Sequence, residues 1–193
     1  MTKENIIIAA LRLFLMRGYK SVSLIDVANE VGITKGGIYH YFSSKDDLLH
    51  VSLHFLFDRF EAKYANLLDE QNPLKTVLYS LMVDRTAERH IKELLQAEGE
   101  CTLDYADFAI TAMRKFPDIQ KRIEHSYVAI CESLSKRIDS AMETGELKSS
   151  FDSFALAASI LALVNGQNSL GSHFQSPAIR QRMLESVLRM LGM

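Results

Sequence analysis

The fold of this chain is decided by a short stretch, residues 33–45, which reads ITKGGIYHYFSSK. Thr34 is a good N-cap residue, because its side-chain oxygen can accept a hydrogen bond from the first free backbone N–H groups of a helix. Gly36 and Gly37 weaken that helix by about 1 kcal/mol each relative to alanine. They also remove side chains where something bulky must come close. The pattern predicts a short helix with an open surface.

Aromatic and basic side chains complete this stretch: Lys35, Tyr39, His40, Tyr41 and Lys45. Each lysine follows a Ser or Thr cap in the first turn of a helix, where the helix dipole makes a cation mildly unfavourable. Helix N-termini bind phosphate, and a nearby lysine strengthens that binding. The alternative is that both lysines are solvated surface residues. The pair, with the glycines and aromatics, favours a nucleic-acid backbone as the partner.

Residues 21–32, which read SVSLIDVANEVG, predict a second compact helix just upstream. Ser23 and Asp26 resemble a capping box in which Asp replaces the usual Glu, and Gly32 is the expected left-handed residue past the helix end. Ile25 is expected on the buried side. A helix, a tight turn with glycine and a second helix make a helix-turn-helix, whose second helix normally enters the DNA major groove.

The first eighteen residues predict a supporting helix that Thr2 caps and Gly18 ends. With this helix in place, residues 6–49 resemble the DNA-binding domain of the TetR family of bacterial transcriptional regulators. One departure is Gly37, where the family commonly has Thr or another small side chain. The matching segments are dense and ungapped: residues 6–14 (IIIAALRLF), 17–19, 23, 25, 27–28, 31–36, 38–42, 44–45 and 48–49.

The resemblance implies an all-α fold of about nine helices. A three-helix DNA-binding domain (1–46) precedes a larger helical domain for effector binding and dimerisation (47–193). The residues that would face DNA are Ser23, Thr34, Lys35, Gly36, Gly37, Tyr39, His40, Tyr41 and Lys45.

Within this set the resemblance implies different roles. Ser23 would donate to a phosphate, and Lys35 would read a base edge, since lysine can donate to guanine O6 and N7. Tyr39, His40 and Lys45 would hold the backbone and set the register. For the tyrosines the alternative is aromatic packing on the first helix.

Composition permits this interpretation without requiring it. The net charge is −2 over 193 residues, with six basic and five acidic residues in positions 1–50. DNA affinity should therefore depend on local placement of charge and on two copies of the domain. Neither a secretory signal pattern nor a long apolar run is present, so a cytoplasmic location is expected, with Cys101 and Cys131 reduced.

The remainder of the chain reads as helix, and each of its prolines stands where a helix would begin. The expected helices run from Lys45 to about residue 69, 73 to about 97, about 103 to 116, 117 to about 145, 152 or 153 to about 170, and 177 to about 191.

The resemblance implies a two-fold dimer formed through the last two helices, and their composition agrees with a covering subunit. The helix over residues 154–170 is apolar nearly all round and carries small residues, so something must cover its outer side. The alternative is an intramolecular core. The expected interface residues are Ala158, Leu161, Ala162, Gly166, Met183 and Val187.

The resemblance implies that the middle helices enclose an effector pocket, and such sites are mostly apolar with a few polar groups. No cationic residue clearly falls on an apolar face, which favours a neutral or hydrophobic effector. Each candidate has ordinary core packing as its alternative. The candidates are Phe55, Tyr64, Tyr79, Met82, His90, Cys101, Tyr105, Phe108, Met113, His125, Tyr127 and Cys131.

Neither a metal nor another cofactor is expected. Of the candidates, His90, Cys101, His125 and Cys131 follow no recognised ligand spacing. Nothing in the sequence supports an enzyme, because it has neither a nucleophile with a spaced base nor a phosphate loop. The resemblance implies a DNA-binding repressor that a small effector releases from a palindromic operator. The alternative is a related DNA-binding protein controlled by a protein partner.

Overall fold

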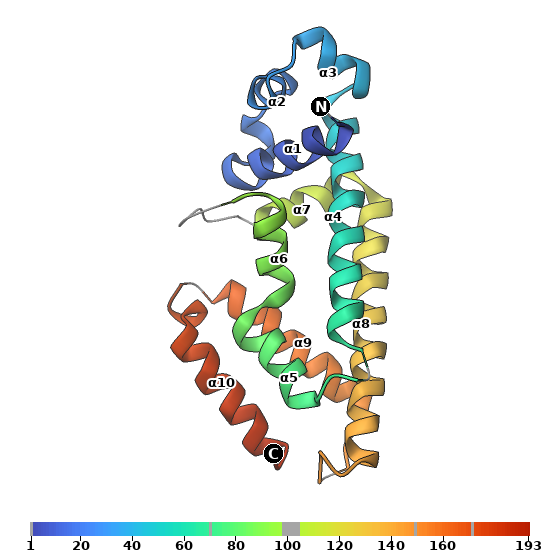
Figure 1. The fold of residues 1–193 in the computed structure, drawn as a ribbon, viewed down its shortest axis with the longest axis vertical. Helices are drawn as coiled ribbons and strands as arrows, with labels where there is room; N and C mark the ends of the chain where they lie inside the picture. The colour runs from blue at the N-terminus through green and yellow to red at the C-terminus, as the bar shows by residue number, and fades with distance from the viewer. Residues whose placement is uncertain (1, 70, 98–104, 149, 171) are drawn as a thin grey trace. The chain divides into compact units, whose positions relative to one another are not determined.

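The computed structural model describes residues 2–69, 71–97, 105–148, 150–170 and 172–193 (Figure 1). These residues form helices and no strand, which confirms the all-α prediction. The α-helices are α1 (Lys3–Arg17), α2 (Leu24–Val31), α3 (Lys35–Tyr41), α4 (Lys45–Leu67), α5 (Leu74–Tyr79), α6 (Thr86–Leu94), α7 (Tyr105–Lys115), α8 (Pro117–Glu143), α9 (Ser153–Ser169) and α10 (Pro177–Met190). Two 3-10 turns, η1 (Tyr19–Ser21) and η3 (Ser172–Gln175), and a π-helical turn, η2 (Ser80–Asp84), connect some of them.

The N-terminal helices begin and end where the sequence predicts. The Thr2 side chain accepts a hydrogen bond from Asn5 N, and Gly18 follows α1 with a φ of 76°. Ser23 and Asp26 form a reciprocal capping box on α2, and Gly32 ends that helix in the left-handed conformation with a φ of 72°. Local chemistry therefore sets the ends of these helices.

The residues divide into two compact units, and the first comprises Met1–Phe60 and His90–Ile123. Its core joins the three N-terminal helices to the first half of α4, the end of α6, α7 and the start of α8. Phe14, Phe42, Leu48 and Leu49 are among its fully buried side chains. Ile91, Leu95, Phe108, Ala112 and Ile119 belong to the same core.

The second unit comprises Glu61–Arg89 and Glu124–Met193. It contains α5, η2, α9 and α10 with parts of α4, α6 and α8. Each unit thus contains residues beyond position 46, so the packing does not divide the chain at the predicted functional boundary between 46 and 47. As a division by function, that boundary stays a prediction.

One predicted helix is two helices in the structure. The expected helix from residue 73 to about 97 is interrupted by η2 and by Arg85, which has a left-handed φ of 52°. The Arg85 side chain is 4% exposed and forms an ion pair with Glu88. Because a buried arginine stands at this break, where glycine or proline would have marked it, the local sequence does not reveal it.

A second correction concerns Ile25, which was expected on the buried side of α2. Its side chain is 44% exposed, whereas Leu24, Val27 and Ala28 are buried. The buried face of α2 is therefore centred one position away from the predicted one, which leaves Ile25 on the surface next to the Ser23 cap.

In the part of the chain that the structure describes, no helix is both long enough and apolar enough to span a membrane.

Candidate nucleic-acid interface and effector pocket

The short helix α3 presents one face to the core and the other to solvent. The Thr34 side chain accepts a hydrogen bond from Gly37 N at 3.1 Å, which fixes the start of the helix. Ile38 and Phe42 are 0% and 1% exposed and belong to the core. Within α3, four of the predicted DNA-facing side chains are exposed: Lys35, Tyr39, His40 and Tyr41.

The aromatic side chains of α3 remain accessible. Tyr39 is 49% exposed and Tyr41 is 40% exposed. The Tyr41 ring contacts its chain neighbours, lying edge-on to His40 with 5.5 Å between ring centroids and tilted 6.5 Å from Phe42. Each phenol can therefore present its hydroxyl to an external partner.

Packing within the chain does not require glycine at positions 36 and 37. A Cβ atom on Gly36 would meet only Thr34 Oγ1, at 4.0 Å. A Cβ on Gly37 would lie 3.4 Å from the same oxygen and 3.6 Å from the nearest atom of Ile33, which is ordinary van der Waals contact. Neither glycine has a positive φ. The missing side chain of Gly36 thus leaves bare backbone on the outer face of α3, whereas Gly37 is half-buried and faces Thr34 and Ile33.

The Lys45 ammonium binds inside its own domain, which the sequence does not predict. Nζ donates to the carbonyl oxygens of Tyr19 at 2.9 Å and Val22 at 2.8 Å, and lies 4.1 Å from the centroid of the Tyr19 ring. Burial lowers the pKa of Lys45. An ammonium has three N–H donors, so Lys45 fastens the start of α4 to the α1–α2 connection and has one donor left for a phosphate.

Tyr19 and Asp46 extend this arrangement. The Tyr19 hydroxyl donates to the Asp46 carboxylate, which also receives Lys115 Nζ at 3.0 Å. Hydrogen bonds from Tyr19 and then Lys115 hold the pKa of Asp46 below its ordinary value, while burial and the Asp46 contact raise the pKa of Tyr19. Because Tyr19 and Asp46 are far apart in sequence, no local sequence motif predicts their contact.

Ser23 has two possible uses for its hydroxyl. Its Oγ donates to Asp26 Oδ2 at 2.6 Å and accepts from Asp26 N at 3.2 Å, while its backbone N donates to the same carboxylate at 2.7 Å. These hydrogen bonds from Ser23 hold the pKa of Asp26 below its ordinary value. The predicted donation to a phosphate therefore competes with the Asp26 carboxylate for the hydroxyl proton.

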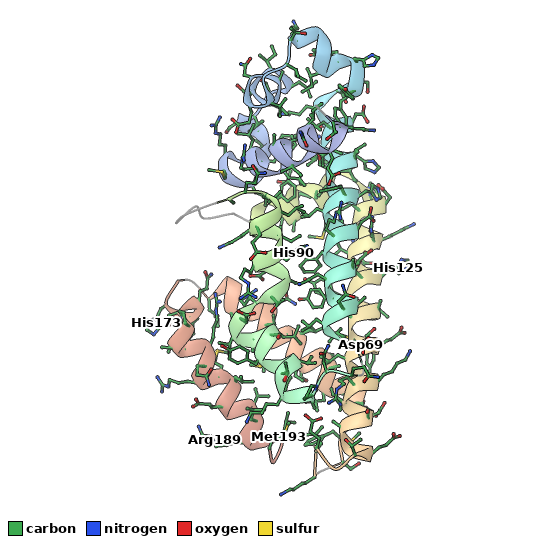
Figure 2. The ribbon with its side chains drawn as sticks, in the orientation of Figure 1. Asp69, His90, His125, His173, Arg189 and Met193 are labelled. Atoms are coloured by element: carbon green, nitrogen blue, oxygen red, sulfur yellow. The ribbon has the colours of Figure 1, made fainter. Side chains whose placement is uncertain are left out.

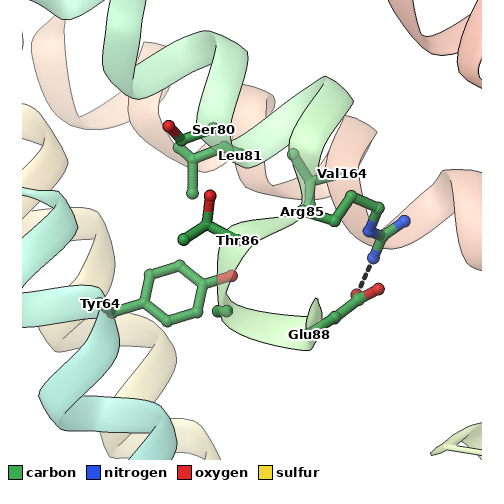
Figure 3. A pocket seen from close by; sticks show the side chains of 8 residues that line it. Tyr64, Ser80, Leu81, Arg85, Thr86, Glu88 and Val164 are labelled. Atoms are coloured by element: carbon green, nitrogen blue, oxygen red, sulfur yellow. Dashed lines mark hydrogen bonds and ion pairs between the residues drawn. The ribbon is translucent and has the colours of Figure 1, made fainter. Parts of the chain in front are cut away.

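A small pocket lies in the second unit (Figure 3). Its volume is about 10 Å³, which is the space of about one water molecule. Side chains from α4, the η2 region, α6 and α9 enclose it: Tyr64, Ser80, Leu81, Arg85, Thr86, Ala87, Glu88 and Val164.

The pocket wall is more polar than expected. Burial raises the pKa of Tyr64 to about 12, so its phenol is a neutral hydrogen-bond donor near pH 7. Arg85 and Glu88 form an ion pair at one side (Figure 3). The expectation that no cation would lie on an apolar face was therefore wrong for Arg85, whose charge Glu88 balances.

Most of the predicted pocket residues lie elsewhere. Of the ten candidates whose side chains the structure describes, Tyr64 alone lines this pocket. Phe108 belongs to the core of the first unit and Phe55 packs against that core. In the second unit, Met82 and Cys131 are buried, whereas Tyr79 is 47% exposed and Tyr127 is 44% exposed. His125 of the same unit lies on the surface (Figure 2). His90 and Met113 are half-buried residues of the first unit. Cys101 and the Tyr105 side chain lie outside the described part of the chain.

The predicted dimer residues fall into two groups. Leu161 and Val187 are buried within the subunit, at 5% and 6% exposed. Ala162 is exposed, whereas Ala158, Gly166 and Met183 are half-buried. Sequence reasoning missed the larger apolar side chains on the same helices, which are Phe154 (48% exposed), Leu163 (40%) and Met190 (71%).

A groove runs along α9 and α10, with a volume of about 360 Å³. Its lining is mainly apolar, and Leu163 and Met190 lie at the surface of it. The lining residues are Leu163, Ile179, Arg182, Met183, Ser186, Val187 and Met190.

Comparison with known proteins agrees with this architecture. The family model described as "Bacterial regulatory proteins, tetR family" matches residues 6–51. The HTH-type transcriptional regulator TtgR of Pseudomonas putida is 26% identical over 174 residues, which cover 86% of this chain and 77% of that protein. The HTH-type transcriptional repressor KstR2 of Mycolicibacterium smegmatis is 27% identical over 116 residues, covering 58% and 57% of the two chains.

Solved structures show the same fold. A TetR-family transcriptional regulator from Cytophaga hutchinsonii superimposes with a TM-score of 0.73 at 18% sequence identity, covering 100% of this chain and 96% of that one. Helix order, the N-terminal helix-turn-helix and these likenesses point to one family. Residues 6–51 thus carry the DNA-binding domain of the tetR family of bacterial regulatory proteins, and the chain as a whole has the fold of TetR-family helix-turn-helix transcriptional regulators.

Proposed function

We propose that this regulator is a repressor: a homodimer that binds a palindromic operator and is released from it by a small, neutral or hydrophobic effector. The single observation that carries the DNA-binding part is the outer face of α3. Lys35, Tyr39 and His40 are exposed there beside two glycines that internal packing does not require. A bare, polar helix face of this kind suits the close approach of a DNA groove. Repression is supported by the likeness to KstR2, a repressor by name.

The proposed contacts divide by chemistry. Lys35 is exposed and pairs with no acid among the described residues, so its ammonium is available for a base edge. Tyr39, His40 and Tyr41, together with the backbone at Gly36 and Gly37, would position α3 against phosphates and sugars. Thr34 holds the helix start. Ser23 would add a phosphate contact at the cost of its bond to Asp26, and Lys45 would add one through its remaining donor.

Dimerisation through α9 and α10 would supply the second copy of α3, since half-site spacing on DNA mirrors protein two-fold symmetry. The support is the exposed apolar surface of Phe154, Leu163 and Met190 beside the groove. Leu163→Arg should give a monomer in sedimentation velocity. Ile110→Arg, at an exposed residue of α7 that is 44% accessible, should leave the dimer intact. If Leu163→Arg stays dimeric, this face is not the interface.

The effector site we propose is the pocket around Tyr64, in an opened form. As it stands, the pocket holds about one water molecule. Its wall includes a π-helical turn, a type of turn found frequently at functional sites, and a left-handed arginine. The Arg85–Glu88 pair balances its own charge, which supports a neutral effector with a polar group for the Tyr64 hydroxyl.

The proposed link between the sites is α4, which carries Lys45 at its first residue and Tyr64 near its last. Effector entry would shift α4 and so change how the two α3 helices are presented to DNA. By thermodynamic linkage, effector and operator must then weaken each other's binding by the same factor.

The deciding experiment is selection of bound sequences from a random DNA pool with the purified protein. Enrichment of one palindrome is expected. Absence of enrichment at low salt, with a folded dimer, would contradict the proposal.

Gly36→Ala and Gly37→Ala provide a matched pair for the same assay. Each should stabilise α3, by about 1 kcal/mol relative to glycine. Gly36 is exposed whereas Gly37 leans toward Thr34 and Ile33, so only Gly36→Ala should weaken operator binding. Equal binding by both variants and the wild type would mean that DNA does not approach this backbone.

A second candidate is control by a protein partner, and the small volume of the pocket favours it. A panel of small neutral molecules, screened for thermal stabilisation and operator release, separates the two. Release by a molecule whose effect Tyr64→Phe weakens supports the effector proposal. Failure of the whole panel, with release by a protein from the same cell, supports the partner.

A further inference from the structure

Two histidines of α4 and the second residue of α8 lie together in the first compact unit. His50 Nε2 is 2.7 Å from Asp118 Oδ2, and His54 Nε2 is 3.4 Å from the same oxygen. One potential ligand atom from each residue lies within 4.8 Å of the other two. We propose that His50, His54 and Asp118 form a binding site for a divalent transition-metal ion, with Zn²⁺ as its representative.

The donor set and its spacing suit this chemistry. Residues four apart on a helix share a face, so His50 and His54 present their rings side by side, 4.7 Å between centroids. Zinc takes imidazole nitrogen and carboxylate oxygen at about 2.0–2.2 Å, and tetrahedral geometry then places ligand atoms about 3.4 Å apart. The His54–Asp118 separation already has this value, and the His50–Asp118 pair must open by about 0.7 Å to reach it.

The surroundings orient the ligands and leave them accessible. Contacts with His50 at 2.7 Å and His54 at 3.4 Å hold Asp118 Oδ2 between the two rings. The Phe116 ring packs 4.9 Å from the His50 ring and restricts its rotation. Side-chain exposures of 36% for His50, 40% for His54 and 55% for Asp118 leave the site open to ions from solvent.

The positive charge of Arg122 lies next to His54 and disfavours a cation there. Its hydrogen bonds also show which proton must move before a metal can bind. Its Nη1 lies 2.9 Å from His54 Nδ1 and 3.4 Å from the His54 carbonyl oxygen, and its Nη2 donates to Asp58 at 2.6 Å. A guanidinium only donates, so in neutral His54 the ring proton is on Nε2. For the metal to bind Nε2, that proton must move to Nδ1. Arg122 then releases Nδ1 and can keep the carbonyl oxygen and Asp58.

Three protein ligands leave a fourth position for water or another small ligand, so exchangeable binding is expected rather than a closed structural site. The ion would join α4 to α8 within the unit that contains the DNA-reading helices. Because a ligand of the folded state alone stabilises that state, Zn²⁺ should raise the melting temperature of the intact protein.

The test uses the full-length protein after treatment with a chelator. Co²⁺ titration followed in the visible spectrum, with Zn²⁺ competition, should show one saturable site per subunit. His50→Ala, His54→Ala and Asp118→Asn should each weaken binding at least about 10-fold, the lower end of what even outer-shell partners contribute. His125→Ala, an exposed histidine farther along α8 (Figure 2), should bind as the wild type does.

Arg122→Gln sharpens the test, because it removes the opposing cation and should tighten metal binding. Far-UV circular dichroism of each metal-free variant separates lost ligands from lost fold, and Asp118→Asn, at the most exposed position, keeps the test usable if a histidine variant unfolds. Absence of saturable binding would overturn the proposal. So would wild-type affinity in all three ligand variants, or equal weakening in His125→Ala.

Discussion

Helices end and begin again within residues 18–45 and within residues 80–86, and the residues that cause these breaks differ between the two regions. In the first region the breaks come from residues with a local reason to be there, such as the Ser23 and Thr34 caps and Gly32 in its left-handed conformation. In the second region a π-helical turn leads into Arg85, a left-handed residue with a buried side chain. No glycine or proline marks it.

This difference distinguishes helix breaks that neighbouring residues in the sequence determine from a helix break that depends on tertiary packing. A break made by caps and glycine persists whatever surrounds it, which suits a helix that must meet DNA in one orientation. A break held by a buried ion pair depends on contacts that another molecule can replace. The breaks of the first region can therefore be read from the sequence, whereas the break of the second region becomes visible only in the structure.

The largest expected effect is at the pair that holds the second break. Glu88→Gln should lower the free energy of unfolding by about 2–3 kcal/mol, somewhat less than the 3–5 kcal/mol typical of a broken buried ion pair, because Glu88 is 31% exposed and Arg85 4%. Urea denaturation measures this. Arg89→Gln, in a pair whose arginine is 54% exposed, should cost less than about 1 kcal/mol. Equal costs would show that the Arg85–Glu88 pair does not hold the break.

The second largest loss of stability is expected at Gly32, which ends α2 in the first region. Gly32→Ala should destabilise the protein by about 1–2 kcal/mol, because a Cβ atom at a left-handed φ of 72° meets the backbone. Thermal melting followed by circular dichroism measures this loss. Gly37→Ala, in a helical conformation, should shift the melting temperature the opposite way. A neutral Gly32→Ala variant would mean that the turn can relax, and the contrast between the regions would weaken.

Lys35→Ala tests the function of the rigid region. Affinity for the preferred operator should fall about 10-fold and base preference should relax, since a lysine that donates to a base edge contributes about 1–3 kcal/mol of discrimination. Binding to a randomised pool measures both effects. Lys92→Ala, at an exposed residue of α6, is the control and should behave as the wild type. A Lys35→Ala protein that selects an unchanged site would remove Lys35 from base reading.

Lys45→Ala should give the smallest change and separates two roles. All DNA sequences should bind more weakly to a similar extent, and the slope of log affinity against log salt should fall by about one unit. Stability should fall by about 1 kcal/mol with the loss of the bonds to Tyr19 and Val22. If the free energy of unfolding falls while the salt slope of DNA binding stays unchanged, Lys45 makes internal hydrogen bonds only and does not contact phosphate.

The sequence predicts the helix-turn-helix well because each boundary has its own chemical signal. The Thr2, Ser23, Thr34 and Asp152 caps accept the hydrogen bonds expected of them. Pro117 and Pro177 begin α8 and α10 as predicted. Such signals act within four residues, so a single sequence is enough to read them.

The pocket could not be predicted in the same way. Arg85 and Glu88 meet Tyr64 and Val164 from other helices, and nothing within any one helix indicates that meeting. The contact of Tyr19 with Asp46 has the same character. The His50–His54 spacing was visible in the sequence, but its third partner, Asp118, begins a different helix. Side chains brought together by tertiary packing require the structure.

The shared core of the first unit limits how DNA-binding segments can be exchanged between related proteins by recombination. Phe108, Ala112 and Ile119 lie in the same core as α1 and α2, although they come much later in the chain. A recombination event that transplanted residues 1–46 into a relative would bring the DNA-reading surface but leave behind the apolar side chains that complete its core. Operator specificity should therefore evolve by point substitutions on α3, with wholesale exchange limited to donors that match at these distant core positions.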